Sequence, residues 1–454
     1  MLQLWTVILL TLILVCFVLL ARNKAVSKYF LFFLFVAFFM WYVTPNILTY
    51  LGIHGVLDFL EISEDDYYSL MIKELSFLIA ILFIFNLLSF RKKIRISRFI
   101  LTENLNYRKQ KVFNFFLYTF LIFYIIYLLI NQMDYVANND ILNQEGGLFQ
   151  ILSFFSSYLV AYLWVNIIFS ESDDNKKIYI LFALGYALAL VLTGSRFYLL
   201  SFVFFGFFMI VKQKSKIKKT FSSLGFALIL ITALFLLPFI SSKRSGADLV
   251  AFQSADTMSN LVLEELNVKL NSTAYSVILL KYDGEGFAGY NPYIGSFLKF
   301  IPRFVWEDKP TATSFNSSIT GIPSRRIPVL LGSKSDTFNT GTSPYAVSAW
   351  QDGTMTILIS IFLNVILFIL INRCFLSNSF LIKSFGFLLI GFPQLVMLPT
   401  TGDNIIQKLI EAFIIFATLL FLGYFKFIKR YETFIPISQL TDDTGECPYS
   451  YREP

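Results

Sequence analysis

Positively charged side chains that could hold phosphate groups lie in the breaks between apolar runs of the sequence. Arg196 lies at a short break between two such runs. A long segment further along the chain carries Lys243, Arg244, Arg303, Lys309, Arg325 and Arg326. The guanidinium group is a planar fork of donors that matches two phosphate oxygens and stays charged, so this set predicts a site for an anionic lipid diphosphate. The alternative for each residue is an ion pair with an acidic residue of the same segment, or a position at the lipid head groups.

Carboxylates in the same breaks are candidates for a general base. Asp65 and Asp66 lie in the first long break, and Glu264 and Glu265 lie in the long segment. A carboxylate at such a place can take a proton from a sugar hydroxyl or bind a divalent cation, although an acidic run in a loop is more often simply solvated. The sequence does not rank these four residues.

The composition gives little support to metal or cofactor chemistry. The chain has one histidine and three cysteines, and the cysteines are far apart. No zinc-binding spacing, phosphate-binding glycine loop or nucleophile triad occurs. We therefore expect neither a metal nor a cofactor.

The elements that must position these residues are membrane spans. The 454 residues are 56% apolar and only 15% charged, with 53 phenylalanines, which excludes a soluble enzyme and a disordered chain. A span needs about 20 largely apolar residues. The runs of this kind are 2–21, 29–48, 69–90, 113–131, 149–170, 178–194, 197–211, 221–240, 353–372, 379–399 and 404–425. The sequence thus predicts an all-α polytopic bundle of about eleven membrane helices.

Lysine and arginine predict the orientation of these spans. Every second break is basic, with eight basic residues in 91–111, whereas 49–68 and 132–148 have none. The positive-inside rule then places the N-terminus outside and the C-terminus in the cytoplasm. We interpret the basic runs as topology signals, and we expect no nucleic-acid partner. Four regions follow: spans 1–240, a large outer segment 241–352, spans 353–425 and a cytoplasmic tail 426–454.

The stretch 290–306 of the outer segment predicts a helix at the membrane surface. Phe297, Phe300, Ile301 and Phe304 recur at helical spacing, and tyrosines and Trp306 flank them as interfacial anchors. Such a helix would lie in the membrane plane and hold Arg303 near a lipid head group. The alternative is that its apolar face packs against the spans.

Two short motifs give the chain a family resemblance. The hairpin motif Val191-Leu192-Thr193-Gly194-Ser195-Arg196 precedes a large outer segment with Pro302-Arg303-x-x-Trp306-x-x-Lys309-Pro310. This combination resembles the Wzy-type polymerases of O-antigen and capsule repeat units. Some members of that family use histidines in outer loops, and the long segment here has none. The resemblance therefore does not imply a mechanism in which a histidine acts as the general base.

The resemblance implies a fold, a reaction and a location. The fold would be GT-C-like and close to the O-antigen ligases, in a bacterial inner membrane with a periplasmic N-terminus. The enzyme would transfer the growing glycan from undecaprenyl diphosphate onto the next lipid-linked repeat unit, beside a flippase and a chain-length regulator of the same pathway. Arg196 and Arg303 match the family's arginines and would be catalytic. Lys309 matches a lysine before proline, and Lys243, Arg244, Trp306, Arg325 and Arg326 would contact substrate.

Three other functions stay open at this point. A GT-C glycosyltransferase that uses a polyprenyl-phosphate sugar could take Asp65 or Asp66 as its base. An O-antigen ligase would differ only in its acceptor. A flippase or transporter for lipid-linked oligosaccharides would place its polar sites near the middle of the membrane.

Overall fold

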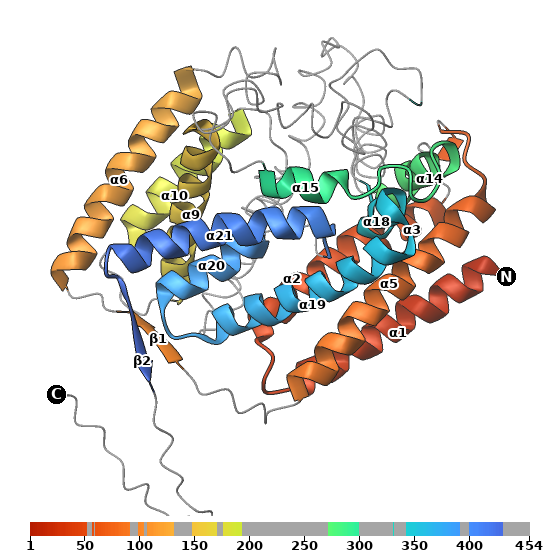
Figure 1. The fold of residues 1–454 in the computed structure, drawn as a ribbon, viewed down its shortest axis with the longest axis horizontal. Helices are drawn as coiled ribbons and strands as arrows, with labels where there is room; N and C mark the ends of the chain where they lie inside the picture. Colours follow the sequence, from red (N-terminus) through yellow and green to blue (C-terminus); the bar gives the residue numbers. More distant parts are fainter. Residues whose placement is uncertain are drawn as a thin grey trace, which may run out of the picture.

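The fold is a bundle of long apolar helices with a small two-stranded ribbon at one end (Figure 1). A computed structural model describes residues 1–51, 57–58, 60–90, 99–103, 107–130, 148–169, 176–192, 271–298, 330, 342–390 and 399–429. The helices of the first half are α1 (Leu2–Arg22), α2 (Lys28–Phe38), the π-helix η1 (Phe39–Val43), α3 (Thr44–Tyr50), α5 (Glu64–Phe90), α6 (Tyr107–Ile130), α9 (Leu148–Phe169) and α10 (Lys176–Leu192). Those of the second half are α14 (Ser272–Tyr282), α15 (Asn291–Leu298), α18 (Pro344–Asp352), α19 (Thr354–Leu376), α20 (Phe380–Ile390) and α21 (Gly402–Phe421).

Within these described ranges, six helices are long and apolar enough to cross a membrane. They are Leu2–Arg22, Lys28–Tyr50, Glu64–Ser89, Arg108–Tyr127, Thr354–Leu376 and Gly402–Phe421. Each coincides with a predicted span. Helices α9, α10 and α20 fall on three further predicted spans, and the predicted spans 197–211 and 221–240 lie outside the described residues. The architecture is that of a polytopic helical membrane protein; the described ranges hold six candidate spans, and the total of eleven stays a prediction.

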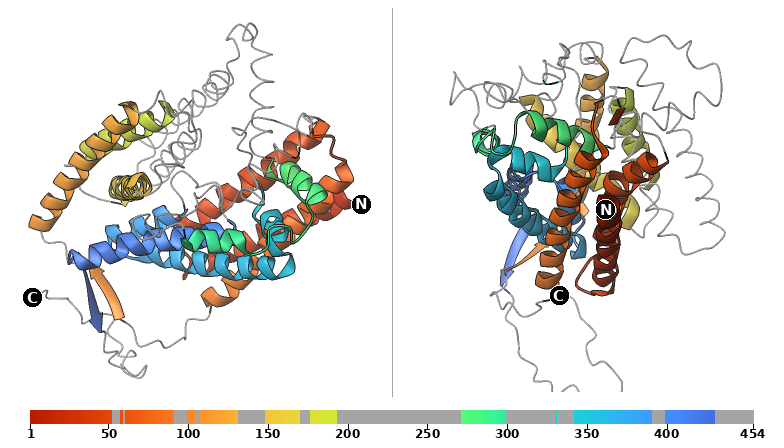
Figure 2. Two further views of the ribbon diagram at one scale, coloured as in Figure 1. Left: turned by 45° about the horizontal axis from the view of Figure 1, so that its top comes forward. Right: turned by 90° about the vertical axis from the view of Figure 1, so that its right-hand side faces the viewer.

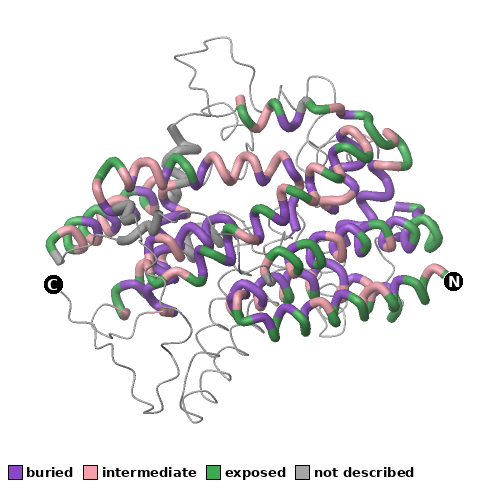
Figure 3. Tube along the Cα trace, turned by 60° about the horizontal axis from the view of Figure 1, so that its bottom comes forward, coloured by how far each residue is buried: buried purple, intermediate pink, exposed green. Residues whose placement is uncertain are grey.

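Many apolar side chains face outward along the spans, as lipid-facing helices require. On α1, Leu4, Val7, Leu12 and Val15 are all exposed, while Ile13 and Leu20 are buried. Figure 3 shows buried and exposed residues alternating along the helices. In water such a surface would be an aggregation hazard, whereas in lipid it is the expected outer face of a bundle.

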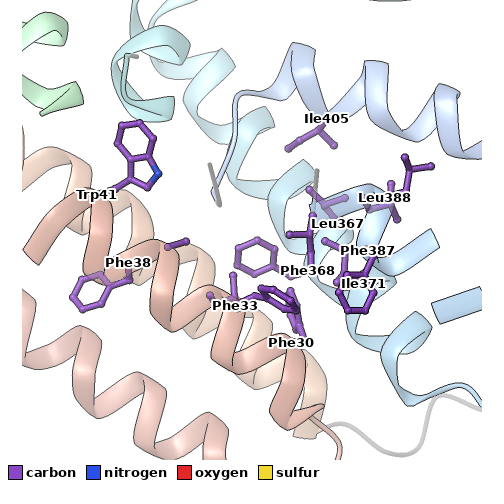
Figure 4. Close-up of a cluster of buried hydrophobic side chains, with 14 of the residues drawn as sticks. Phe30, Phe33, Phe38, Trp41, Leu367, Phe368, Ile371, Phe387, Leu388 and Ile405 are labelled. Carbon is purple, nitrogen blue, oxygen red and sulfur yellow. The ribbon is translucent and has the colours of Figure 1, made fainter. Parts of the chain in front are cut away.

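Phenylalanine side chains fill the core between α2, α19 and α20 (Figure 4). Phe30 lies edge-on to Phe368, with ring centroids 5.6 Å apart, and Phe33 lies edge-on to Phe387 at the same separation. Edge-to-face pairs contribute about 0.5–1.5 kcal/mol beyond the burial of their area. The many phenylalanines of the sequence therefore act as packing residues that join the N-terminal and C-terminal spans.

The basic segments of the sequence gather at one end of the bundle. Asn372, at the end of α19, receives a hydrogen bond of 2.7 Å from the Ser27 amide and donates one of 2.9 Å to the Ala25 carbonyl. At the start of α6, the Lys109 ammonium donates to the Gly423 carbonyl at 3.0 Å. Gln3 and Glu64 meet at the opposite end. In the described ranges, segment 22–28 therefore contacts the end of α19 and segment 91–111 contacts the turn after α21, as a shared side requires. Segment 212–219 lies outside the described residues, and the absolute orientation stays a prediction.

The sequence predicted an all-α fold, but the described residues also form a β-ribbon at this basic end. Strand β1 (Phe99–Glu103) pairs antiparallel with β2 (Phe425–Lys429), so that Leu101 faces Phe427. The last span consequently ends at Phe421 and not at 425 as predicted, and the first residues of the predicted tail belong to a strand. Gly423 permits this sharp change of direction because its φ of 72° is disfavoured for other residues.

Candidate functional site

Most of the residues predicted to carry chemistry lie outside the described part of the chain. They are Arg196, Lys243, Arg244, Glu264, Glu265, Arg303, Trp306, Lys309, Arg325 and Arg326. Asp65 and Asp66 are described, and both are exposed in the first turn of α5. Asp66 lies 4.0 Å from the Lys281 ammonium, and this exposed ion pair joins α5 to α14.

A different carboxylate, Glu74, is buried inside the bundle. It lies on α5, within a candidate span, and its side chain is inaccessible to solvent. The Thr273 hydroxyl of α14 donates a hydrogen bond of 2.6 Å to Glu74 Oε2. This length is typical of a strong hydrogen bond to a carboxylate. An ionisable residue inside a span is costly to bury, and this makes Glu74 a candidate functional residue.

Hydroxyl groups surround the Glu74 carboxylate. The Ser343 hydroxyl lies against it, and the phenols of Tyr42 and Tyr67 interact with it electrostatically. We call Thr49, Tyr67, Glu74 and Thr273 the Glu74 cluster. Glu74 Oε1 is buried and has no hydrogen-bond partner in the described ranges, whereas the Tyr67 phenol lies against the side chains of Thr49 and Asn271.

A change of helix geometry occurs beside this cluster. The second span is α-helical over α2, π-helical over η1 and α-helical again over α3. Tyr42 of η1 is one of the residues that interact with Glu74, and Thr49 lies on α3. Short π-helical segments within α-helices are frequent at functional sites. The π-helix is therefore a second, independent indication that the region around Glu74 is a functional site.

A phenol of the long segment interacts electrostatically with both Glu74 and the exposed Glu285. Tyr345 of α18 is half-buried, and burial raises the pKa of its hydroxyl, to which the negative charges of Glu285 and Glu74 add. Glu285 is exposed and lies 3.8 Å from the Lys73 ammonium. Lys73 thus pairs at the surface, and its charge does not compensate that of Glu74.

Three helices of the long segment, α14, α15 and α18, are built into the bundle; we call them the docked helices (Figure 2). Besides the Glu74–Thr273 bond, the Ser343 amide donates to the Ser276 hydroxyl at 2.8 Å and joins α18 to α14. The Trp350 indole donates to Asp283 at 3.0 Å. The segment 241–352 is therefore no freely projecting loop where it is described.

Hydroxyl groups also fix α15 on the spans. The Tyr293 hydroxyl lies 3.1 Å from Ser360 Oγ of α19, and Ser360 Oγ lies 2.7 Å from Ser348 Oγ of α18. The Tyr293 ring packs on Gly402, the first residue of α21, and burial raises the pKa of this phenol to about 12. Tyr293 is therefore buried. The sequence predicted it to be an interfacial anchor, and that prediction was wrong.

The helix around 290–306 is confirmed in its first part, Asn291–Leu298. Its two faces differ, since Tyr293 is buried against the spans while Ile294 and Phe297 are exposed. Exposed apolar side chains beside a packed face suit a helix at the membrane surface. Phe297, the described member of the predicted apolar face, is exposed and does not pack against the spans. Phe300, Ile301 and Phe304 lie outside the described residues, and a position of this helix in the membrane plane stays a prediction.

The chemistry open to this arrangement is proton transfer or cation binding by a single buried carboxylate with hydroxyl neighbours. Among the residues that the structure describes, no three His, Cys, Asp or Glu side chains gather in a way that could hold a metal ion. The sequence analysis did not single out Glu74 because this residue lies within the apolar run 69–90, which was interpreted only as a membrane span. The available signal was a charged pair, Lys73 and Glu74, inside a predicted span.

Comparisons with known proteins give no assignment. No family model matches the chain, and neither a curated protein nor a solved structure is similar to it.

Proposed function

We propose that the protein is a membrane glycosyltransferase that polymerises lipid-linked oligosaccharide repeat units. The growing glycan leaves undecaprenyl diphosphate and joins the terminal sugar of the next lipid-linked unit. The resemblance of the two arginine motifs to Wzy-type polymerases motivates this proposal. The polytopic helical architecture agrees with it.

One observation carries the proposal furthest: the docked helices fasten the long segment onto the spans. Helix α15, held by Tyr293, ends at Leu298, five residues before Arg303 in the sequence. An arginine that stabilises a leaving group must be held in place before the reaction starts, because a mobile cation loses much of its benefit to reorganisation. Fixing the helix that precedes the Pro302-Arg303 motif serves this purpose.

The proposed reaction needs charge stabilisation and a proton acceptor. The acceptor hydroxyl attacks the anomeric carbon, the carbon–oxygen bond to the diphosphate breaks, and the diphosphate departs with the bonding electrons. Arg196 and Arg303 hold that negative charge, and losing one such donor typically costs about 3–4 kcal/mol. The hydroxyl proton passes to a carboxylate, for which Asp65, Asp66, Glu264 and Glu265 remain the candidates.

The setting of this reaction is proposed from the same resemblance. The chain would lie in a bacterial inner membrane with its N-terminus in the periplasm and its C-terminus in the cytoplasm. The basic end of the bundle, with the β-ribbon, would then face the cytoplasm, and the docked helices would lie at the periplasmic leaflet. A flippase would supply the substrate, and a chain-length regulator would act on the product.

The test is a polysaccharide gel from cells that carry arginine variants. Arg303→Lys keeps the charge but loses the fork, so we expect about 100-fold less chain growth. Arg373→Lys, at the exposed end of α19, is the matched control and should leave the ladder unchanged. A normal ladder from Arg303→Lys and Arg303→Ala cells with undiminished protein would refute the role of Arg303.

Transport of a lipid-linked oligosaccharide is the second candidate, and the burial of Glu74 within a span favours it. Transporters place charged residues inside the membrane, and Glu74 lies within a candidate span. Gene deletion separates the two functions. A single-repeat band in place of a ladder supports the polymerase, whereas complete loss of surface glycan supports transport.

A further inference from the structure

Helix α21, a candidate membrane span, carries polar side chains in its first half only. They are Asp403, Asn404, Gln407, Lys408 and Glu411, and we call them the α21 polar face. Residues three and four apart lie on the same side of a helix, so these five form one stripe along α21. The second half, 412–421, has a single polar side chain, Thr418. The polarity of this span is therefore confined to one of its ends.

The polar half of α21 is the half that lies away from the β-ribbon. Helix α21 starts beside α15 and ends near β2 (Figure 1). Its first residue, Gly402, lies against the Tyr293 ring, and Asp403 interacts electrostatically with this phenol. At a rise of 1.5 Å per residue, the polar face extends about 12 Å along the helix. In the proposed orientation it occupies the periplasmic half of the span.

Hydrogen bonds fix the polar face at both of its ends. The Asn364 side chain, from the middle of α19, donates to the Thr400 carbonyl at 2.8 Å and accepts from the Thr400 amide at 3.0 Å. Asn404 in turn donates to the Thr400 hydroxyl at 2.9 Å. Further along α21, the Gln407 amide donates to Glu411 at 2.7 Å. The face is thus held in one arrangement before a ligand arrives, which lowers the cost of binding.

Most of the polar face is not sealed in the core. Its first four side chains are half-buried, and Glu411 is buried. Asp403 Oδ1 has no hydrogen-bond partner in the described ranges. Polar side chains inside a span face the bundle interior or water, because contact with lipid chains is too costly. Either water and a polar ligand, or another part of the chain, must therefore lie against this face.

We propose that the α21 polar face binds the sugar part of the lipid-linked substrate, inside the half of the membrane that lies away from the β-ribbon. The identity of this substrate rests on the proposed function. Asp403 accepts hydrogen bonds from sugar hydroxyl groups, while the amides of Asn404 and Gln407 donate and accept them. Tyr293 holds α15 beside the start of the same face, and the Pro302-Arg303 motif follows α15 in the sequence.

The charges of the polar face favour a sugar over the other parts of the substrate. The face has two carboxylates, Asp403 and Glu411, and one ammonium group, Lys408, so its net charge repels a diphosphate. An isoprenoid chain would bury polar side chains without giving them hydrogen bonds. In the part of the chain that the structure describes, no three His, Cys, Asp or Glu side chains gather to hold a metal ion. Sugar hydroxyls both donate and accept, as this mixture of groups requires.

The first part of the test is the access of water to the polar face. The full-length protein, with Cys16→Ala, Cys374→Ala and Cys447→Ala, is placed in lipid nanodiscs, where both membrane surfaces are open to a charged thiol reagent. Such a reagent needs an ionised thiol in water, so we expect Asn404→Cys and Gln407→Cys to react at least about tenfold faster than Phe413→Cys. Phe413 is the matched control because it is 67% exposed on the apolar half of the same helix. Lys408→Cys replaces either variant that does not insert.

The second part is protection of the thiol by substrate. The probes are undecaprenyl diphosphate with an attached repeat unit and the same lipid without sugar. We expect the sugar-bearing lipid at saturation to slow the labelling of Gln407→Cys at least about fivefold, and the sugar-free lipid to leave it unchanged. Thr418→Val, added to Gln407→Cys, should keep the concentration for half-maximal protection, since Thr418 bonds only to its own helix at 2.8 Å.

Two results would overturn the proposed site. One is labelling of Asn404→Cys and Gln407→Cys no faster than that of Phe413→Cys, which would show that other parts of the chain cover the face. The other is a failure of the sugar-bearing lipid to protect better than the sugar-free lipid. Protection by sugar in a protein that makes no longer chains would keep the site and reject the polymerase, and chain growth without protection would do the reverse.

Discussion

The hydrogen bond from Thr273 to Glu74 should be a main fastening of the long segment to the spans. Thr273→Val keeps the shape of the side chain and removes the donor. Hydrogen bonds between membrane helices average about 0.6 kcal/mol and reach about 1.7, whereas bonds to charged groups contribute about 1.5–3 kcal/mol. The 2.6 Å separation and the complete burial of Glu74 place this bond at the strong end of the first range. We expect Thr273→Val to lower the free energy of unfolding by about 1.5–2 kcal/mol.

The assay is a denaturant titration of purified protein in detergent, combined with a double-mutant cycle. In the Glu74→Gln background the same substitution should cost clearly less, because the acceptor is then neutral. Thr11→Val is the matched control, since Thr11 is exposed on α1 and bonds only to its own helix at 2.8 Å. Its effect should stay within about 0.5 kcal/mol. Equal effects of Thr273→Val and Thr11→Val would refute the reasoning.

Three further substitutions test the packing that supports the site. Gly402→Ala places a methyl group against the Tyr293 hydroxyl, so we expect a loss of about 1–3 kcal/mol in the same titration; Tyr293→Phe should relieve part of that loss, and additive effects would contradict the contact. Asn372→Ala removes the two hydrogen bonds that hold the turn after α1 and should cost about 1–3 kcal/mol; a thermal shift indistinguishable from wild type would speak against this. Gly353→Ala should destabilise by about 1–2 kcal/mol because its φ of 62° disfavours a side chain, and an unchanged melting temperature would contradict that.

Hydropathy and charge were enough to predict the coarse architecture. Where the structure describes them, the span-length apolar runs are helices, since only a helix or a closed barrel satisfies its backbone in lipid. The alternation of lysine and arginine also predicted which segments share an end, as Ala25, Asn372, Lys109 and Gly423 show by their contacts. These features follow from averages over many residues, and averages can be read from sequence.

The site could not be predicted in the same way, because it depends on single residues and distant pairs. The mean hydropathy of the run 69–90 is so high that Glu74 does not change the prediction of a span. Its partner Thr273 lies 199 residues away in the sequence. Helix α14 buries Ser272, Thr273 and Ser276, polar residues that suggest an exposed helix until their partners are known. The π-helix η1 has no hydropathy signature. Strands β1 and β2 are five residues each and join segments more than 300 residues apart.

The polymerase proposal is tested most directly by reconstitution. Purified protein in liposomes is given repeat units linked to undecaprenyl diphosphate, and the products are separated by mass. The account predicts lipid-linked chains of two or more repeats and one undecaprenyl diphosphate released for each linkage, with both products lost in Arg303→Ala. Repeat units that stay single while the lipid-linked sugar crosses the bilayer would contradict it.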